Sequence, residues 1–298
     1  MSGSAASGAV SSAVVPSAPL VALDTLWLQV AGTVCNIQCT HCFISSSPTN
    51  HAHELMSLAD VRPYLEEAER LGVKEYYLTG GEPFLNREIL EIIEAALGLG
   101  PVSVLTNGLL IRPETAARLR ALSDASPYSL DLRISIDGAD AATNDPIRGQ
   151  GTFDRIVAAI GMLARAGLNP VVTVTEACEG AVTADGRANL LAFLRRCGLS
   201  QPRLKVLPLL RLGAEATRSR AYAEWESLAG RDLTPDEAEA LQCSSCRMVT
   251  SRGVYVCPIL IDYPAARMAG TLSEAMRPFA LSYAACFTCH EQGLSCRT

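Results

Sequence analysis

Between residues 26 and 210, short apolar runs alternate with longer amphipathic runs. The apolar runs have the length and composition of buried strands, and the amphipathic runs have the periodicity of helices. Strands are predicted at residues 26–31, 75–79, 102–106, 131–136, 171–175 and 204–207. Helices are predicted at residues 57–71, 87–97, 113–123, 152–166 and 187–197. Six β/α units in series predict an α/β fold, with a parallel sheet and helices outside it.

Residues typical of helix ends flank several of the predicted helices. Ser57 is suited to an N-cap and Pro113 to a first helical turn. Gly72, Gly167 and Gly198 follow three helices, where glycine commonly ends a helix in the left-handed conformation. These positions support the predicted boundaries.

The alternation stops after residue 210. Residues 211–242 are rich in charged residues and predict a helical connector, whereas residues 243–298 hold six cysteines in 56 residues. Such a cysteine density indicates a small domain held together by metal. The predicted organisation is therefore a disordered leader (1–22), an α/β core (23–210), the connector, and a cysteine-rich domain (243–298).

Charge and hydropathy exclude several classes of function. The 298 residues carry a formal net charge of −6 without long runs of one sign, so nothing forms a basic footprint for nucleic acid. No apolar run reaches the roughly 18 residues of a membrane helix. The first 20 residues contain no Lys or Arg, so the charged start of a secretory signal is missing and a cytoplasmic protein is expected. Eleven cysteines without such a signal favour metal binding or redox chemistry over disulfides.

Three cysteines follow the first predicted strand closely. Cys35, Cys39 and Cys42 have the spacing C-x3-C-x2-C, and residues 35–42 are called the cysteine loop below. Three thiolates can hold three irons of a four-iron cluster and leave the fourth iron open to a ligand. The alternative is a zinc loop, but structural zinc usually needs four ligands, and the next cysteine is Cys178.

This spacing, with His41 before the last cysteine, resembles the radical S-adenosylmethionine (SAM) enzymes. The resemblance implies an open, partial (β/α)6 barrel of the radical SAM type with a [4Fe–4S] cluster. The open iron of that cluster would bind the amine and carboxylate of SAM. In parallel β/α folds the functional residues gather in the loops that follow the strands.

The second predicted strand is followed by Gly80, Gly81, Glu82 and Pro83. Two glycines allow the backbone to approach a ligand closely, although strand-to-helix turns often carry glycine for other reasons. The run resembles the radical SAM motif that binds the amino group of SAM. On that match, all four residues are expected to bind the cofactor.

Further cofactor-binding candidates follow other strands. Ser135 and Asp137 share one strand face by the two-residue period, and the resemblance implies that they face SAM or substrate. Arg148 resembles the arginine that meets the SAM carboxylate, for which a guanidinium is well suited. Asn107 would line the SAM pocket and Phe43 would pack on adenine. The alternatives are an Asn-Gly turn, a turn aspartate, a solvated arginine and ordinary loop packing.

The C-terminal cysteines have the layout C-x2-C-x10-C, a gap of 28, and C-x2-C-x6-C. Two pairs could form a zinc ribbon. The layout also resembles the radical SAM extensions that hold an auxiliary cluster, in the short version called twitch. Cys243 or Cys246 would then act with later cysteines, and one thiol of this pair would remain to donate a hydrogen atom. We assign Cys246 to that catalytic role and the following cysteines to metal: Cys243, Cys257, Cys286, Cys289 and Cys296.

Taken together, the motifs resemble twitch enzymes of aminoglycoside biosynthesis, including epimerases and dehydrogenases. That resemblance implies a 5′-deoxyadenosyl radical that removes hydrogen from a sugar-like alcohol carbon, followed by epimerisation or oxidation. A flavodoxin or ferredoxin would supply electrons. One alternative is a peptide maturase, which the short stretch before the first strand disfavours. The other is a non-catalytic iron–sulfur or zinc protein.

Overall fold

The computed structural model describes residues 14–294. One mostly parallel sheet of nine strands dominates the fold, in the order β10-β9-β8-β2-β3-β4-β5-β6-β7. The six predicted strands form its consecutive parallel part, so the predicted α/β fold is confirmed. They are β2 (Thr25–Leu28), β3 (Glu75–Leu78), β4 (Val102–Thr106), β5 (Leu130–Ser135), β6 (Val171–Thr175) and β7 (Arg203–Leu207).

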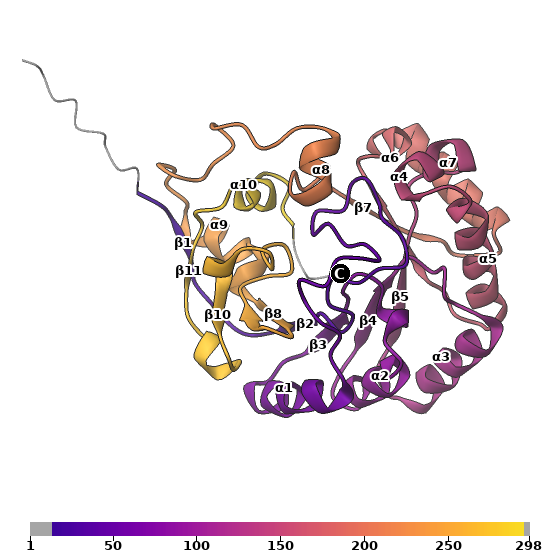
Figure 1. The fold of residues 1–298 in the computed structure, drawn as a ribbon, viewed down its shortest axis with the longest axis horizontal. Helices are drawn as coiled ribbons and strands as arrows, with labels where there is room; N and C mark the ends of the chain where they lie inside the picture. The colour runs from indigo at the N-terminus through magenta and orange to yellow at the C-terminus, as the bar shows by residue number, and fades with distance from the viewer. Residues whose placement is uncertain (1–13, 295–298) are drawn as a thin grey trace, which may run out of the picture.

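Helices cover the outer side of this sheet (Figure 1). The five predicted helices are α1 (Leu58–Leu71), α2 (Ile89–Leu97), α3 (Pro113–Ala125), α5 (Thr152–Arg165) and α7 (Ala184–Arg196). Ser57 caps α1 in a capping box with Asp60, and Gly72 ends it with φ 77°. Pro113 is the first residue of α3, as predicted.

Two helices follow strands where none was predicted. α4 (Ala141–Arg148) follows β5, and α6 (Glu179–Val182) follows β6. α4 has only eight residues and contains Pro146, which disfavours a helix interior, so the sequence did not indicate a helix there. This matters because α4 carries Arg148 toward the strand ends.

The segment after β7 contains little regular structure before residue 242. It holds α8 (Gly213–Arg218) and α9 (Pro235–Ala240), which together account for a minority of residues 211–242. The rest of the predicted helical connector is turns and extended chain.

The cysteine-rich segment continues the main sheet. β8 (Cys246–Thr250) runs parallel to β2, with Thr25 opposite Cys246. β9 (Gly253–Tyr255) and β10 (Arg267–Ala269) then extend the sheet in the antiparallel sense. Figure 1 shows this segment, in orange and yellow, lying against β2. The C-terminal cysteines are therefore attached to the sheet that carries the cysteine loop, and α10 (Ala284–Glu291) completes the segment.

The predicted disordered leader is only partly within the described residues. Residues 1–13 lie outside them, but β1 (Ser17–Ala18) pairs with β11 (Phe279–Ala280), and Ala18 is buried. Residues 14–22 are therefore ordered against the C-terminal segment, in contrast to the expectation. The Ser- and Ala-rich composition did not reveal this pairing because its partner lies 262 residues away.

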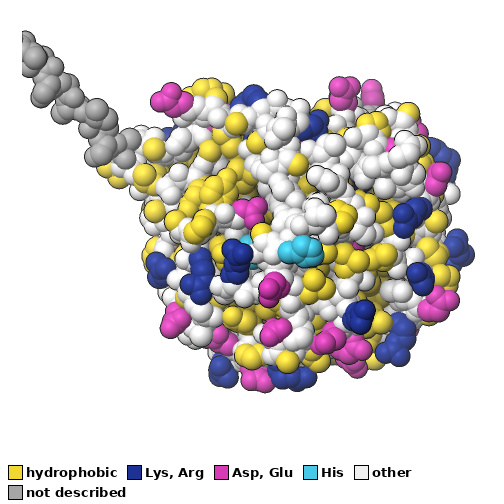
Figure 2. All heavy atoms as spheres, viewed as in Figure 1, with side chains coloured by type: hydrophobic (Ala, Val, Ile, Leu, Met, Phe, Trp, Pro, Cys, Tyr) yellow, Lys and Arg dark blue, Asp and Glu magenta, His cyan; other side chains and the backbone are white. Residues whose placement is uncertain are grey.

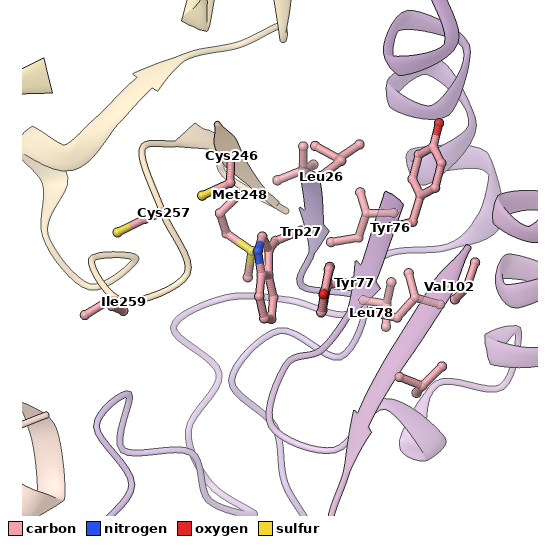
Figure 3. Packing of buried hydrophobic residues seen from close by; sticks show 14 of the residues in the cluster. Leu26, Trp27, Tyr76, Tyr77, Leu78, Val102, Cys246, Met248, Cys257 and Ile259 are labelled. Atoms are coloured by element: carbon pink, nitrogen blue, oxygen red, sulfur yellow. The ribbon is translucent and has the colours of Figure 1, made fainter. Parts of the chain in front are cut away.

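Successive side chains of β3 point to opposite faces of the sheet and have different neighbours. On β3, Tyr77 points toward Trp27 and Met248 while Tyr76 points toward the helices (Figure 3). The rings of Trp27 and Tyr77 stack with centroids 4.4 Å apart. Both faces are buried, as expected of a parallel sheet.

No described helix is both long and apolar enough to cross a lipid bilayer. On the face drawn in Figure 2, charged side chains of both signs are scattered without a large patch of one sign.

Candidate active site

A cavity of about 300 Å³ lies at the carboxyl ends of the strands. Its walls come from the cysteine loop, the turn after β3, strands β4 to β7, the chain after β7, and the C-terminal segment. This is the end of a parallel sheet at which ligands are expected. Most of its lining is apolar, including Ile44, Leu105, Leu207 and Ile259.

All three cysteines of the cysteine loop line the cavity. The loop is held by backbone hydrogen bonds at both ends: Cys35 N donates to Ser47 O (3.1 Å), and Thr40 N donates to Ile147 O (2.9 Å). Burial raises the pKa of the Cys35 thiol to about 12 and that of Cys39 to about 11. A metal centre bound here would release these protons, because thiolates are the ligands.

The two glycines after β3 bring that turn directly against the chain leading into the cysteine loop. A Cβ on Gly81 would lie 2.0 Å from Val34 O, and one on Gly80 would lie 2.8 Å from Ala31 Cβ. Gly81 N donates to Gly32 O at 2.9 Å. Both glycines line the cavity, and no larger residue fits either position without moving the backbone.

Glu82 is fully buried and does not line the cavity. Its Oε1 accepts from Thr106 Oγ1 (2.6 Å) and Phe84 N (3.1 Å), and its Oε2 accepts from Asn107 N (2.8 Å). Burial raises its pKa, an effect that these hydrogen bonds oppose. The carboxylate therefore ties the turn after β3 to the end of β4. Pro83, also buried, begins a single 3₁₀ turn behind it.

Asn107 connects the end of β4 to the cysteine loop. Its Nδ2 donates to Asn36 Oδ1 (2.8 Å) and approaches Cys35 Sγ (3.7 Å). Its Oδ1 accepts from Leu109 N, which is the predicted Asn-Gly turn. Asn107 therefore forms the expected turn and lines the cavity, while its contact with SAM stays a prediction.

Asp137 is fully buried at the end of β5, beside Arg148 and His41. Arg148 Nε lies 2.7 Å from Asp137 Oδ2, and His41 Nε2 lies 2.6 Å from the same oxygen. Asp137 Oδ1 accepts from the amide and hydroxyl of Thr175. Burial alone would raise the pKa of Asp137, but the Arg148 charge and the His41 contact hold it well below its usual range.

The structure thus brings most predicted residues to one place, in different roles. Arg148, Ser135 and Phe43 line the cavity, whereas Asp137 lies behind Arg148 and His41. Cofactor binding by these residues stays a prediction, since the geometry shows where they are and not what they bind.

Four C-terminal cysteines surround a second, smaller cavity. They are Cys243, Cys257, Cys286 and Cys289. The pKa of the Cys286 thiol is raised to about 12, by burial first and then by Cys243. Cys246 lines neither cavity and is fully buried in β8, so its role as hydrogen donor stays a prediction without geometric support. Cys296 lies outside the described residues.

Arg247 supports the backbone beside these cysteines. It is fully buried, and its guanidinium donates to the carbonyl oxygens of Cys243 and Cys246, both at 2.7 Å. It also donates to those of Ala275 (3.0 Å) and Arg277 (2.7 Å). A cation buried against neutral carbonyls needs negative charge nearby, which cluster-bound thiolates would provide.

Within residues 14–294, no three His, Cys, Asp or Glu side chains converge closely enough to hold a single metal ion.

Sequence reasoning missed polar residues on the cavity wall. Gln29 and Arg133 line the cavity and lie inside the predicted buried strands LWLQVA and DLRISI. Arg133 precedes Ser135 by two residues, so strand alternation alone would have placed it on the same inward face. Thr173 also lines the cavity and lies opposite Ser135 in the sheet.

The family comparison matches residues 30–177 to the Radical SAM superfamily. The mycofactocin maturase MftC of Mycolicibacterium smegmatis is 40% identical over 135 residues, which are 45% of this chain and 32% of that protein. The AdoMet-dependent heme synthase of Methanosarcina barkeri is 36% identical over 142 residues, 47% of this chain and 38% of that protein. The alignments thus span well under half the length of these relatives.

Solved structures of low sequence identity share the fold. SuiB of Streptococcus suis bound to its precursor peptide SuiA has a TM-score of 0.64 at 16% identity, covering 88% of this chain and 65% of that one. The enzyme anSMEcpe with bound AdoMet has a TM-score of 0.61 at 16% identity, covering 84% and 79%.

These comparisons confirm the radical SAM fold and, with it, a [4Fe–4S] cluster and SAM as cofactors. The number of C-terminal cysteines suits an auxiliary cluster as well. The finer resemblance to aminoglycoside epimerases and dehydrogenases is not confirmed, because the relatives named above are a maturase and a heme synthase.

Proposed function

Because residues 30–177 form a radical SAM domain, we propose that this protein modifies a peptide by radical chemistry at an apolar residue. The main cavity would hold SAM together with that residue. The maturase relative supports a peptide substrate over a sugar.

The residues around the cavity fit the cofactors. The main cavity is lined by Cys35, Cys39 and Cys42, and none of the three forms a disulfide. When bound, the cluster and SAM supply a 5′-deoxyadenosyl radical that removes a hydrogen atom from an unactivated C–H bond. The auxiliary cluster on Cys243 and its three neighbours, and a flavodoxin or ferredoxin as electron donor, are part of this proposal.

The chain's own residues shape and shield the reaction. Asp137 holds Arg148 and His41 at the edge of the cavity, so these side chains are oriented before a ligand arrives. Asn107 Nδ2 points at Cys35 Sγ and would donate to that sulfur when it is a metal ligand. The apolar walls keep water away from a radical formed between them.

The observation that carries the choice of substrate is the charge of the cavity wall. Its described lining contains Arg133, Arg148, Lys205 and His41, and neither aspartate nor glutamate. Arg148 and His41 are paired with the buried Asp137 behind the wall. An aminoglycoside carries several ammonium groups and hydroxyls, which require carboxylates and many hydrogen-bond partners. A largely apolar wall with cationic groups fits an apolar peptide residue near a negative charge.

Epimerisation or oxidation of a sugar-like alcohol carbon is the competing candidate. A separate chain can supply the element that recognises a precursor peptide. The short stretch before β2 therefore does not argue against a peptide substrate. The two candidates differ in the substrate that accelerates SAM cleavage.

The test measures 5′-deoxyadenosine formed by the anaerobically reconstituted protein with SAM and dithionite. One set of reactions receives synthetic peptides that end in Val, Leu, Phe or Tyr, and the other receives candidate aminoglycosides. Accelerated cleavage together with a mass change in a peptide supports the proposal. A modified aminoglycoside and unchanged peptides would contradict it.

A further inference from the structure

Five side chains on the wall of the main cavity have buried polar atoms without a hydrogen-bond partner among the described residues: Gln29, Ser46, Arg133, Arg148 and Thr173. Ser46 belongs to the chain after the cysteine loop and Arg148 forms an ion pair with Asp137, whereas the other three lie on or next to strands. Both amide atoms of Gln29, Arg133 Nε and Thr173 Oγ1 are buried and make no hydrogen bond there. The exposed fractions of these residues are 0%, 6% and 9%. Buried polar groups are normally paired, and each unpaired one weakens the fold. All three line the same cavity, which suggests a common ligand.

Arg133 is the centre of this group. Its Nη2 donates to Tyr77 Oη at 3.1 Å, and its Cζ lies 4.8 Å from the centre of the Tyr77 ring. Tyr77 in turn stacks on Trp27, so a row of three side chains fixes the guanidinium inside the sheet. Among residues 14–294, no carboxylate lies within ion-pair distance of Arg133.

The other arginine of the wall differs in this respect. Arg148 lies at the cysteine loop and is neutralised by Asp137 at 2.7 Å. Arg133 lies two residues before Ser135, the last residue of β5, and so enters the cavity from deeper in the sheet. Its charge is therefore available to a ligand at the inner end of the cavity.

We propose that Gln29, Arg133 and Thr173 form a subsite for a carboxylate of the substrate, with an apolar side chain beside it. A guanidinium binds a carboxylate through paired hydrogen bonds, and the Gln29 amide and Thr173 hydroxyl add neutral donors. The neighbouring wall contributes Leu105, Leu207 and the Trp27 ring. The subsite rests on the proposed function and specifies which part of the peptide binds there. That part is the C-terminal carboxylate together with an apolar C-terminal residue.

The inference is tested by binding, with the cluster-loaded protein and SAM present. The probes are N-acetyl-phenylalanine and its amide, which differ only in the carboxylate. Calorimetric titration should show the acid binding about tenfold more tightly, as expected for about 1.4 kcal/mol. Arg133→Gln should bring this ratio to about one, and Arg133→Lys should retain part of it. Equal affinity of the native protein for both probes, or no detectable binding of either, would overturn the subsite.

A second pair of variants separates binding from folding. Gln29→Met and Thr173→Val remove unpaired polar atoms at nearly constant volume. Each should weaken binding of the acid severalfold while raising the melting temperature by about 2–4 °C, since a buried unsatisfied group is lost. Variants that lower the melting temperature and leave binding unchanged would show that these groups are structural.

SAM also carries a carboxylate, so its affinity is measured on the same Arg133→Gln protein. Retained SAM binding supports a substrate subsite, whereas lost SAM binding assigns Arg133 to the cofactor and overturns the inference. Binding of the acid without modification of any peptide would leave the subsite standing and contradict the proposed function alone. Modification of a peptide, together with equal affinity for the acid and the amide, would contradict the subsite and leave the proposed function standing.

Discussion

Asp137 joins the end of β5 to the cysteine loop through His41, whose Nε2 lies 2.6 Å from Asp137 Oδ2. The same oxygen holds Arg148, so one buried carboxylate positions two residues of the cavity wall. His41 stands between two cluster cysteines in the chain. The strand end and the metal-binding loop are thus mechanically connected before any cofactor is present.

Replacing this carboxylate should therefore destabilise the fold. Asp137→Asn leaves Arg148 buried without its counter-charge, which costs about 3–5 kcal/mol in the free energy of unfolding. Denaturant titration measures this loss. Asp140→Asn is the matched control, because Asp140 is an exposed N-cap of α4 and Asn caps a helix nearly as well. Equal stability of the two variants would contradict the role given to Asp137.

The pH dependence of stability gives a second test of the same group. Because the folded-state pKa of Asp137 is depressed, its contribution is present above the unfolded value of about 3.9 and is lost as the pH falls below it. The stability difference between the native protein and Asp137→Asn should therefore shrink on acidification. A difference that stays constant from pH 6 down to about pH 2 would contradict the assigned ion pair.

The glycine turn should tolerate no side chain. Gly81→Ala places a methyl group against Val34 O, forces the turn away from the cysteine loop, and should cost about 1–3 kcal/mol. SAM cleavage should fall with it, because the turn lines the cavity. Gly161→Ala in α5 is the control, since the close neighbour of its Cβ is the flexible end of Arg165, Cys197 O lies at an ordinary 3.8 Å, and alanine favours the helix. Unaltered SAM cleavage by Gly81→Ala would refute this account of the turn.

Arg247 should be essential to the cysteine-rich segment. Arg247→Met removes the donor from four carbonyl groups, at about 1–3 kcal/mol for each one left unsatisfied, so a large loss of stability is expected. Arg252→Met, at an exposed position of the adjoining turn, should change stability little. Comparable melting temperatures for the two variants would exclude the structural role of Arg247.

The iron content should distinguish the two groups of cysteines. The reconstituted protein should contain about eight irons, from two four-iron clusters. Cys286→Ser should reduce this to about four, whereas Cys178→Ser should not change it, because Cys178 lies apart from both cavities. About one zinc and four irons in the native protein would instead identify the C-terminal site as a zinc site.

The order of the β/α units could be predicted because buried parallel strands and amphipathic helices have distinct periodicities. The attachment of β8 to β2 could not, since the two strands are separated by more than 200 residues and no local pattern records which strands pair. The cysteine density of that segment suggested a separate small domain, whereas the segment contains a strand, β8, that joins the main sheet.

The sequence predicted which types of residue form the site, but not which groups each residue contacts. Glu82 was expected to bind the cofactor, and its carboxylate accepts hydrogen bonds from Thr106, Asn107 and Phe84 inside the fold, so cofactor binding by Glu82 stays a prediction. A sequence shows which groups can accept hydrogen bonds, and only the fold shows which donors reach them first. Arg133 was overlooked for a different reason: it lies inside an apolar strand, although its two-residue spacing from Ser135 places both on the same strand face.

The most direct test of the central claim follows a hydrogen atom from the substrate. A peptide that accelerates SAM cleavage is synthesised with a fully deuterated side chain on its C-terminal apolar residue. The 5′-deoxyadenosine formed from it is then analysed by mass spectrometry. We predict that it gains one deuterium, and that the Cys42→Ala protein forms none of it. Unlabelled 5′-deoxyadenosine from every such peptide, with deuterium transferred instead from a labelled aminoglycoside, would contradict the account.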